Sequence, residues 1–335
     1  MTPVTYSVRP AQLNQKKITI MSFTILSFCG GGIRGLASVT MLNQLYQKYP
    51  NIILAANMLA GTSTGGGIIA ALAAANETPQ ELIDFFWTSE LDFYKNPNSD
   101  PTQPAYSTTE FASDMKKKYG TQTLGDITTH KMLFTSFWVG TTNPSDFWAP
   151  VLFHNFSIYG KPHTFLADAV VYTGAMPGMF GAYNGYVDGA FVNHDPTLAA
   201  IALAVNSGVN LTDIVVICFG TGFMGNSLGP ETANWGAQQW QQGDTGSYNV
   251  PALLVNGSIS PILNMSLSGT STILAQILAG WLLPERYAYL NPTLDYFIPE
   301  NDTDRTQLKY LQDQSINAVD YSTAEALVKN YWPSS

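Results

Sequence analysis

The chain has 335 residues, of which 45% are hydrophobic and only 12% charged, and its formal net charge is −9. Disordered chains have the opposite composition, so this one is expected to fold. An acidic balance without a basic face is not typical of nucleic-acid binding, and we expect no nucleic-acid partner. With two cysteines and four histidines, neither a disulfide framework nor a cysteine-based zinc site is expected. We expect no metal and no cofactor.

Residues 1–20 read as an irregular N-terminal arm, and residues 21–335 as a single domain without a linker or an internal repeat. The arm lacks the charged-then-apolar layout of a secretory signal, which predicts a cytoplasmic location or export without a classical signal peptide. No stretch approaches 18 consecutive apolar residues, so no membrane-spanning helix is expected.

The first third of the chain alternates strand and helix patterns. Residues 23–28 are apolar and end at three glycines, which predicts a buried strand. Apolar residues then recur at helical spacing over 36–49. A second short apolar segment, 57–60, runs into a glycine-rich turn followed by an alanine-rich helix that ends near residue 75. This repetition of strand, glycine turn and helix predicts an α/β fold with a parallel sheet.

Further elements follow in the same way. Thr78, with Pro79 and Glu81 behind it, predicts a capped helix start. Segment 225–250 is a long polar loop, either a lid or an ordinary surface loop. Segment 270–283 is apolar on a helical spacing and is expected to be a core helix rather than one that dips into lipid. The remaining predictions are a loop over 95–110, strands over 131–139, 151–159, 186–188 and 214–219, and helices over 167–173 and 196–205.

The glycine run after the first strand fits the pattern G-x-G-x-x-G. A dinucleotide site also needs an acidic residue about 20 positions later, but residues 36–76 contain none. We therefore expect no nucleotide. Such a loop can instead aim backbone N–H groups at a developing negative charge, as an oxyanion hole requires. A tight turn without chemistry is the alternative. The residues concerned are Gly30, Gly31, Gly32, Arg34, which adds a positive charge or anchors the loop, and Gly35.

A second motif, Gly61-Thr62-Ser63-Thr64-Gly65, lies between a short apolar segment and a helix. This context is typical of a nucleophile elbow, in which the serine occupies a strained turn. Gly61 and Gly65 would let the strand and the helix approach each other. The motif predicts Ser63 as a nucleophile, with a structural Gly-Ser turn as the alternative.

A nucleophilic serine needs a base. His130, His154 and His163 are expected to be surface or core histidines, and His194, six residues after Asp188, lies too close to it for the usual Asp-to-His separation of an α/β hydrolase. Asp188 ends a short β-prone segment at a glycine, although an Asp-Gly pair is also an ordinary turn. Asp195 is better explained as a helix N-cap before Pro196.

Together the two glycine motifs and Asp188-Gly189-Ala190 resemble the patatin-like phospholipase family, over roughly residues 23–292. The resemblance implies a three-layer α/β/α fold with a mostly parallel sheet. It also implies a catalytic dyad of Ser63 and Asp188, an oxyanion hole from the amides of Gly30, Gly31 and Gly32, and support from Arg34. The segment Asn193-His194-Asp195-Pro196 departs from the usual paired asparagines, which leaves the role of His194 open.

The expected function is that of a phospholipase A-type lipid acyl hydrolase that cleaves fatty acyl esters through an acyl-serine. Its partners would be a membrane phospholipid or another acyl lipid, met in transient contact with a membrane surface. The net charge argues against strong attraction to anionic membranes. An acyltransferase acting on an alcohol acceptor, and a non-catalytic lipid-binding or storage protein on the same fold, are the alternatives.

Overall fold

The computed structural model describes residues 22–143, 145–224, 228–243 and 260–333. The arm expected over 1–20 lies outside the described residues, as do 225–227 and 244–250 of the polar segment. The described part of that segment includes a 3₁₀ turn, Pro230–Asn234, and a short helix, α9 (Ala237–Gln242).

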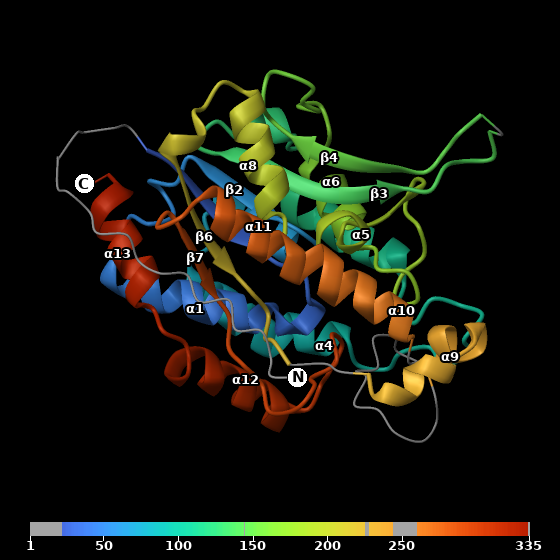
Figure 1. The fold of residues 1–335 in the computed structure, drawn as a ribbon. Helices are drawn as coiled ribbons and strands as arrows, with labels where there is room; N and C mark the ends of the chain where they lie inside the picture. The colour runs from blue at the N-terminus through green and yellow to red at the C-terminus, as the bar shows by residue number, and fades with distance from the viewer. Residues whose placement is uncertain (1–21, 144, 225–227, 244–259, 334–335) are drawn as a thin grey trace.

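In the described residues seven strands form one sheet in the order β4-β3-β2-β1-β6-β7, with β5 also paired to β3 (Figure 1). Strands β3, β2, β1, β6 and β7 run parallel to their neighbours, while β4 and β5 run antiparallel to β3. The sheet is therefore mostly parallel, as predicted. The strands are β1 (Phe23–Phe28), β2 (Met58–Gly61), β3 (Lys131–Trp138), β4 (Ala149–His154), β5 (Tyr186–Asp188), β6 (Ile214–Phe219) and β7 (Tyr287–Leu290).

Helices cover both faces of the sheet and complete a three-layer α/β/α arrangement (Figure 1). One layer includes α1, α2, α6, α12 and α13, and the other includes α8 and α11. The bounds are α1 (Gly35–Lys48), α2 (Thr64–Ala70), α3 (Pro79–Phe85), α4 (Leu91–Phe93), α5 (Thr108–Tyr119), α6 (Leu166–Gly174), α7 (Ala190–Asn193), α8 (Thr197–Asn206), α10 (Pro261–Asn264), α11 (Ala275–Leu282), α12 (Arg305–Asn317) and α13 (Ser322–Tyr331).

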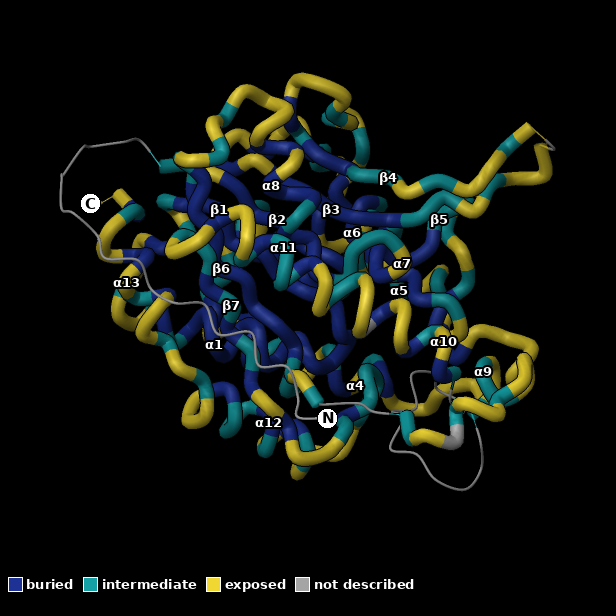
Figure 2. Tube along the Cα trace, viewed as in Figure 1, coloured by how far each residue is buried: buried dark blue, intermediate teal, exposed yellow. Residues whose placement is uncertain are grey.

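Side-chain alternation along the central strands builds a core on each face. Leu26 and Phe28 of β1 belong to the core under α1 and α2, whereas Ile25, the residue before Leu26, belongs to the core under α8. This is the period of two that a strand imposes. Figure 2 shows the buried strands inside an exposed outer layer. Residues from both ends of the described chain, Leu26 and Trp332, belong to the same core.

Most predicted elements occur close to their expected places. Strands 23–28 and 214–219 have the predicted bounds, and Thr78 forms the full capping box with Glu81. Three predictions were displaced. The strand expected over 151–159 is β4, which ends at His154. The loop expected over 95–110 gives way to α5 at Thr108. Helix α8 begins at Thr197, and the Asp195 carboxylate reaches past Pro196 to accept the Thr197 N–H (2.9 Å).

The prediction of a core helix over 270–283 was wrong. The helix begins already at Pro261 and continues through a π-helical segment, Met265–Leu274, into α11. Its small side chains, Ala275 and Ala279, pack on the protein, whereas Leu274 and Trp281 are exposed. Helical spacing identifies an apolar stripe but not which side of it meets the core.

Candidate active site

The serine turn joins the end of β2 to the start of α2. Ser63 has φ 55° and ψ −124°, a conformation that costs a side-chain-bearing residue on the order of 1–3 kcal/mol. Any side chain at the flanking glycines would clash with the backbone. A Cβ at Gly61 would lie 2.3 Å from the Gly65 carbonyl oxygen, and one at Gly65 would lie 2.2 Å from the carbonyl oxygen of Phe28. This is the geometry that the elbow motif predicts.

Two threonines hold the turn in place. The Ser63 N–H donates to Oγ1 of Thr173 on α6 (2.9 Å). Thr62 is buried, and its hydroxyl donates to the carbonyl oxygen of Asn193 (2.6 Å), in the segment that follows Asp188. The strained serine is therefore fixed by contacts with distant parts of the chain. No motif in the sequence pointed to Thr173, which lies 110 residues from Ser63.

Strand pairing brings Asp188 toward the serine turn. Gly61 at the end of β2 pairs with Phe134 of β3, and Asp188 at the end of β5 pairs with Ser136, two residues further along the same strand. Two residues of a strand span about 7 Å. Because β5 runs antiparallel to β3, its final residue points back toward the end of β2. The two candidate residues, 125 positions apart in the chain, thus lie together.

The Asp188 carboxyl is fully buried and only partly satisfied. Its Oδ1 accepts the N–H of Ala190 (2.7 Å), while Oδ2 has no hydrogen-bond partner of good geometry in the described residues. Burial raises the pKa of Asp188 to about 7, although the Ala190 N–H and the neighbouring Ser63 hydroxyl both act to lower it. A carboxylate with a pKa near neutrality is suited to act as a general base.

Only some of the backbone N–H groups in the glycine loop after β1 are free of a hydrogen-bond acceptor. The Gly30 N–H donates to the carbonyl oxygen of His194 (3.0 Å), so it is not free to bind an oxyanion, contrary to expectation. The N–H groups of Gly31, Gly32 and Thr64 have no acceptor among the described residues. Gly32 has φ 57°, and a Cβ there would lie 2.1 Å from the Glu300 carbonyl oxygen.

Arg34 anchors this loop rather than facing open space. Its guanidinium forms an ion pair with Glu300 (3.0 Å) and lies over the ring of Phe297. The backbone oxygen of Glu300 also accepts the Ile33 N–H (2.7 Å). Burial opposes ionisation of Glu300, but His194 and Arg34 outweigh it and lower the pKa of its carboxyl. Glu300 could not be found from the sequence, because 266 residues separate it from Arg34 and no motif surrounds it.

His194 lies in the segment that follows Asp188 and contacts three other parts of the chain. Its carbonyl oxygen accepts the Gly30 N–H, and its ring Nδ1 hydrogen-bonds the hydroxyl of Thr272 (3.1 Å). Its Nε2 lies 4.0 Å from the Glu300 carboxylate. These contacts fit a structural residue. The other histidines stand apart: His130 Nδ1 contacts the Ala56 carbonyl (2.8 Å), His154 is buried, and His163 is exposed.

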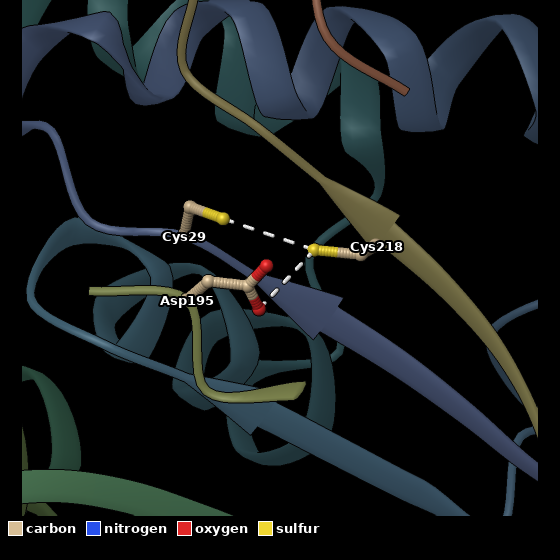
Figure 3. A group of neighbouring side chains, drawn as sticks. All are labelled: Cys29, Asp195 and Cys218. Carbon is tan, nitrogen blue, oxygen red and sulfur yellow. Dashed lines mark hydrogen bonds between the residues drawn. The ribbon is translucent and has the colours of Figure 1, made fainter. Parts of the chain in front are cut away.

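A buried cluster of possible metal ligands, Cys29, Cys218 and Asp195, lies beneath the glycine loop (Figure 3). The two sulfurs are 3.7 Å apart, and the Cys218 thiol donates to Asp195 Oδ1 (3.6 Å). The hydrogen bond to Cys218, together with burial, raises the pKa of the Cys29 thiol, and burial raises that of Cys218. The two thiols and the carboxyl therefore form hydrogen bonds with one another within the core. The cluster is therefore explained as hydrogen-bonded core, and we assign it no metal.

A cavity of about 360 Å³ opens beside the serine. Ser63 and Gly32 line it, and most of its wall is apolar, including Ala71, Phe86 and Val170. Glu90 also lines it, and burial raises the pKa of that carboxyl to about 7. The site thus joins a strained serine, a buried carboxyl, free backbone amides and an apolar cavity.

A serine on a strand-to-helix elbow, beside a buried carboxyl, is the arrangement of serine-dependent acyl hydrolases. Comparison with known proteins gives the family. Residues 26–201, more than half of the chain, match the family model described as patatin-like phospholipase. The chain therefore belongs to the patatin-like phospholipase family and is, in general terms, a lipid acyl hydrolase.

Several named proteins are similar to this chain. Protein teg of Priestia megaterium is 29% identical over 289 residues, which cover 82% of this chain and 89% of that protein. Patatin-like protein 2 of Oryza sativa subsp. indica is 26% identical over 300 residues, covering 74% and 70% of the two chains. Patatin group A-2 of Solanum tuberosum is 25% identical over 260 residues, covering 65% and 66%.

Solved structures with a similar fold are more distant. VipD from Legionella pneumophila has a TM-score of 0.44 at 11% identity, over 93% of this chain and 67% of that one. Human GIVD cytosolic phospholipase A2 has a TM-score of 0.41 at 10% identity, over 93% of this chain and 60% of that one.

Proposed function

We propose that this protein is a phospholipase A-type hydrolase that cleaves fatty acyl esters of phospholipids or other acyl lipids at a membrane surface. Ser63 is the nucleophile and Asp188 the base. The observation that carries the proposal is a strained serine that lines an apolar cavity and lies beside a buried, half-satisfied carboxyl. Family membership supports the substrate class.

In the first half-reaction, ionised Asp188 takes the proton of the Ser63 hydroxyl as its oxygen attacks the ester carbonyl carbon. The carbonyl oxygen becomes an oxyanion and accepts hydrogen bonds from the free amides of Gly31 and Gly32, with Thr64 close by on the serine turn. Each such donor typically contributes ~10²–10³ in rate. The C–O bond to the alcohol then breaks, and the alcohol leaves with the proton held by Asp188.

In the second half-reaction, water replaces the alcohol. Asp188 takes a proton from the water, whose oxygen attacks the acyl-serine. The tetrahedral intermediate uses the same amides, and the fatty acid leaves as the Ser63 oxygen regains its proton. A positioned base is worth ~10²–10⁴ in rate. Arg34 and Glu300 act at a distance, by holding the glycine loop in the form that exposes its amides.

The apolar cavity gives the acyl chain a place beside the attacking oxygen. Its lining by Ala71, Phe86 and Val170 removes apolar chain surface from water, which favours binding by roughly 25 cal/mol per Å² buried. An acyl group held there would place its ester carbon at Ser63, which is the orientation that an enzyme uses to lower the entropic barrier.

The test is hydrolysis of phosphatidylcholine in mixed micelles, with fatty acid and lysolipid measured by mass spectrometry. Wild-type protein should release both, whereas Ser63→Ala and Asp188→Asn should each lose at least 10³-fold in kcat. An arm with added alcohol reports transfer, since an acyltransferase would give a new ester in place of free fatty acid. Wild-type turnover retained by either variant would overturn the dyad.

A further inference from the structure

The helical run Pro261–Leu282 carries large apolar side chains on the outside of the molecule. Exposed residues include Met265 (52%), Ile262 (56%) and Trp281 (65%). By length and composition alone this helix could cross a membrane, yet its opposite face is held by the protein, where Leu267, Ala275 and Ala279 are buried. One face of the helix is therefore packed on the protein, and the other is exposed. We call it the apolar helix.

Charge is absent from this part of the chain. Residues 245–284 contain no Asp, Glu, Lys, Arg or His, although the whole chain carries −9. A surface that binds a charged protein partner or an anionic ligand would be expected to present complementary charge. An uncharged apolar face with an exposed tryptophan matches the boundary between lipid headgroups and acyl chains instead.

The apolar helix is also joined directly to the loop that carries the proposed base. The Ser271 hydroxyl donates to the carbonyl oxygen of Ala190 (2.9 Å) and accepts the N–H of His194. The Ser271 carbonyl accepts the N–H of Asp195 (3.1 Å), and Thr272 contacts the His194 ring. In Figure 1 the helix crosses the molecule from α11 to α10. A lipid surface bound to the exposed face of the apolar helix would therefore contact the same helix that packs on the segment following Asp188.

We propose that the exposed face of the apolar helix docks the protein on the surface of a neutral, zwitterionic lipid bilayer. This rests on the proposed function, since acyl lipids are the reason for the protein to meet a bilayer. Docking is driven by burial of Ile262, Met265 and Trp281 among the headgroups and upper acyl chains. It presents the active-site loop to the lipid through Ser271 and Thr272.

The test measures binding rather than hydrolysis. All variants carry Ser63→Ala, so that vesicles stay intact and the outcome does not depend on catalysis. Binding to phosphatidylcholine vesicles is measured by flotation for this parent, for Met265→Gln/Trp281→Gln in the same background, and for Leu54→Gln as the matched control. Leu54 is 70% exposed and lies between α1 and β2, away from the apolar helix.

The parent should float with the vesicles, the double variant should bind at least 10-fold more weakly, and the control should stay within about twofold. Adding anionic lipid should not strengthen binding, because the protein is itself negative. Equal binding by the double variant, failure of the parent to bind, or a requirement for anionic lipid would each overturn the proposal. If the parent bound vesicles but the wild-type protein did not hydrolyse phosphatidylcholine, the result would count against the proposed function and not against the docking proposal.

Discussion

The Gly30 N–H donates to the carbonyl oxygen of His194 at 3.0 Å, and this single bond ties together the two loops that flank the serine. One loop follows β1 and exposes the amides of Gly31 and Gly32. The other follows Asp188. Because the bond is made between backbone groups, it fixes the distance between the proposed oxyanion hole and the proposed base whatever side chains surround them.

The first prediction concerns the pH dependence of hydrolysis. Burial raises the pKa of Asp188 to about 7, and only its ionised form can accept the serine proton. The kcat/KM for a soluble ester should therefore rise with pH and level off above an inflection near pH 7. Glu90 also has a pKa raised to about 7 by burial, so Glu90→Gln is the control and should retain the inflection. A flat profile from pH 5 to 9 would contradict the role of Asp188.

The second prediction concerns stability. The pKa of Asp188 is higher in the folded protein than its ordinary value of 3.8, so folding favours the neutral acid. The contribution of the Asp188 carboxyl to the free energy of unfolding is full below pH 3.8 and is lost as pH rises toward 7, by roughly 4 kcal/mol in total. Asp188→Asn removes this loss. Its melting temperature should exceed that of the wild type at pH 8, and the two should converge at pH 4. A variant less stable than the wild type at pH 8 would show that the carboxylate is better solvated than its burial indicates.

The third prediction concerns the anchor of the glycine loop. Glu300→Gln leaves the nearly buried Arg34 guanidinium without its ionic partner, which should cost on the order of 3 kcal/mol of stability and at least 10-fold in kcat. Glu325→Gln breaks the exposed ion pair with Lys48 and is the control, with an expected melting temperature close to that of the wild type. Thermal melts and ester assays on both variants provide the check. Similar effects from the two substitutions would remove the special role of Glu300.

The fourth prediction concerns the apolar cavity. Ala71 is buried and lines it, so Ala71→Leu should shorten the space available to a bound acyl chain. We expect the kcat/KM to fall at least 10-fold for a long-chain ester and less than threefold for a butyryl ester. The ratio between the two substrates is the readout, because loss of folded protein would lower both equally. An unchanged ratio would place the acyl chain elsewhere.

Local patterns predicted the parts of the site that lie within one turn of chain. The elbow around Ser63 was evident because its steric demands fall on Gly61 and Gly65, two residues away on either side. Strand β6 was evident because its six consecutive apolar residues end at the turn Gly220-Thr221-Gly222. The strained φ of Ser63 follows from the same motif.

What escaped prediction depends on contacts between distant residues. Glu300 reaches Arg34 across 266 residues, and Thr173 reaches Ser63 across 110. The bond that occupies the Gly30 N–H is also made by a distant residue, so the motif alone could not tell free amides from bonded ones. For the apolar helix, the helical spacing of apolar residues was visible in the sequence. That Ala275 and Ala279 face the protein and Trp281 faces outward depends on packing against distant residues, which the sequence does not show.

The central claim is that Ser63 forms the covalent intermediate with help from Asp188, and labelling with a fluorophosphonate probe tests it most directly. Peptide mapping by mass spectrometry should find the adduct on the peptide that contains Ser63. It should be absent from Ser63→Ala and form at least 100-fold more slowly in Asp188→Asn. An adduct on another residue of the wild type, or undiminished labelling of Asp188→Asn, would contradict the claim.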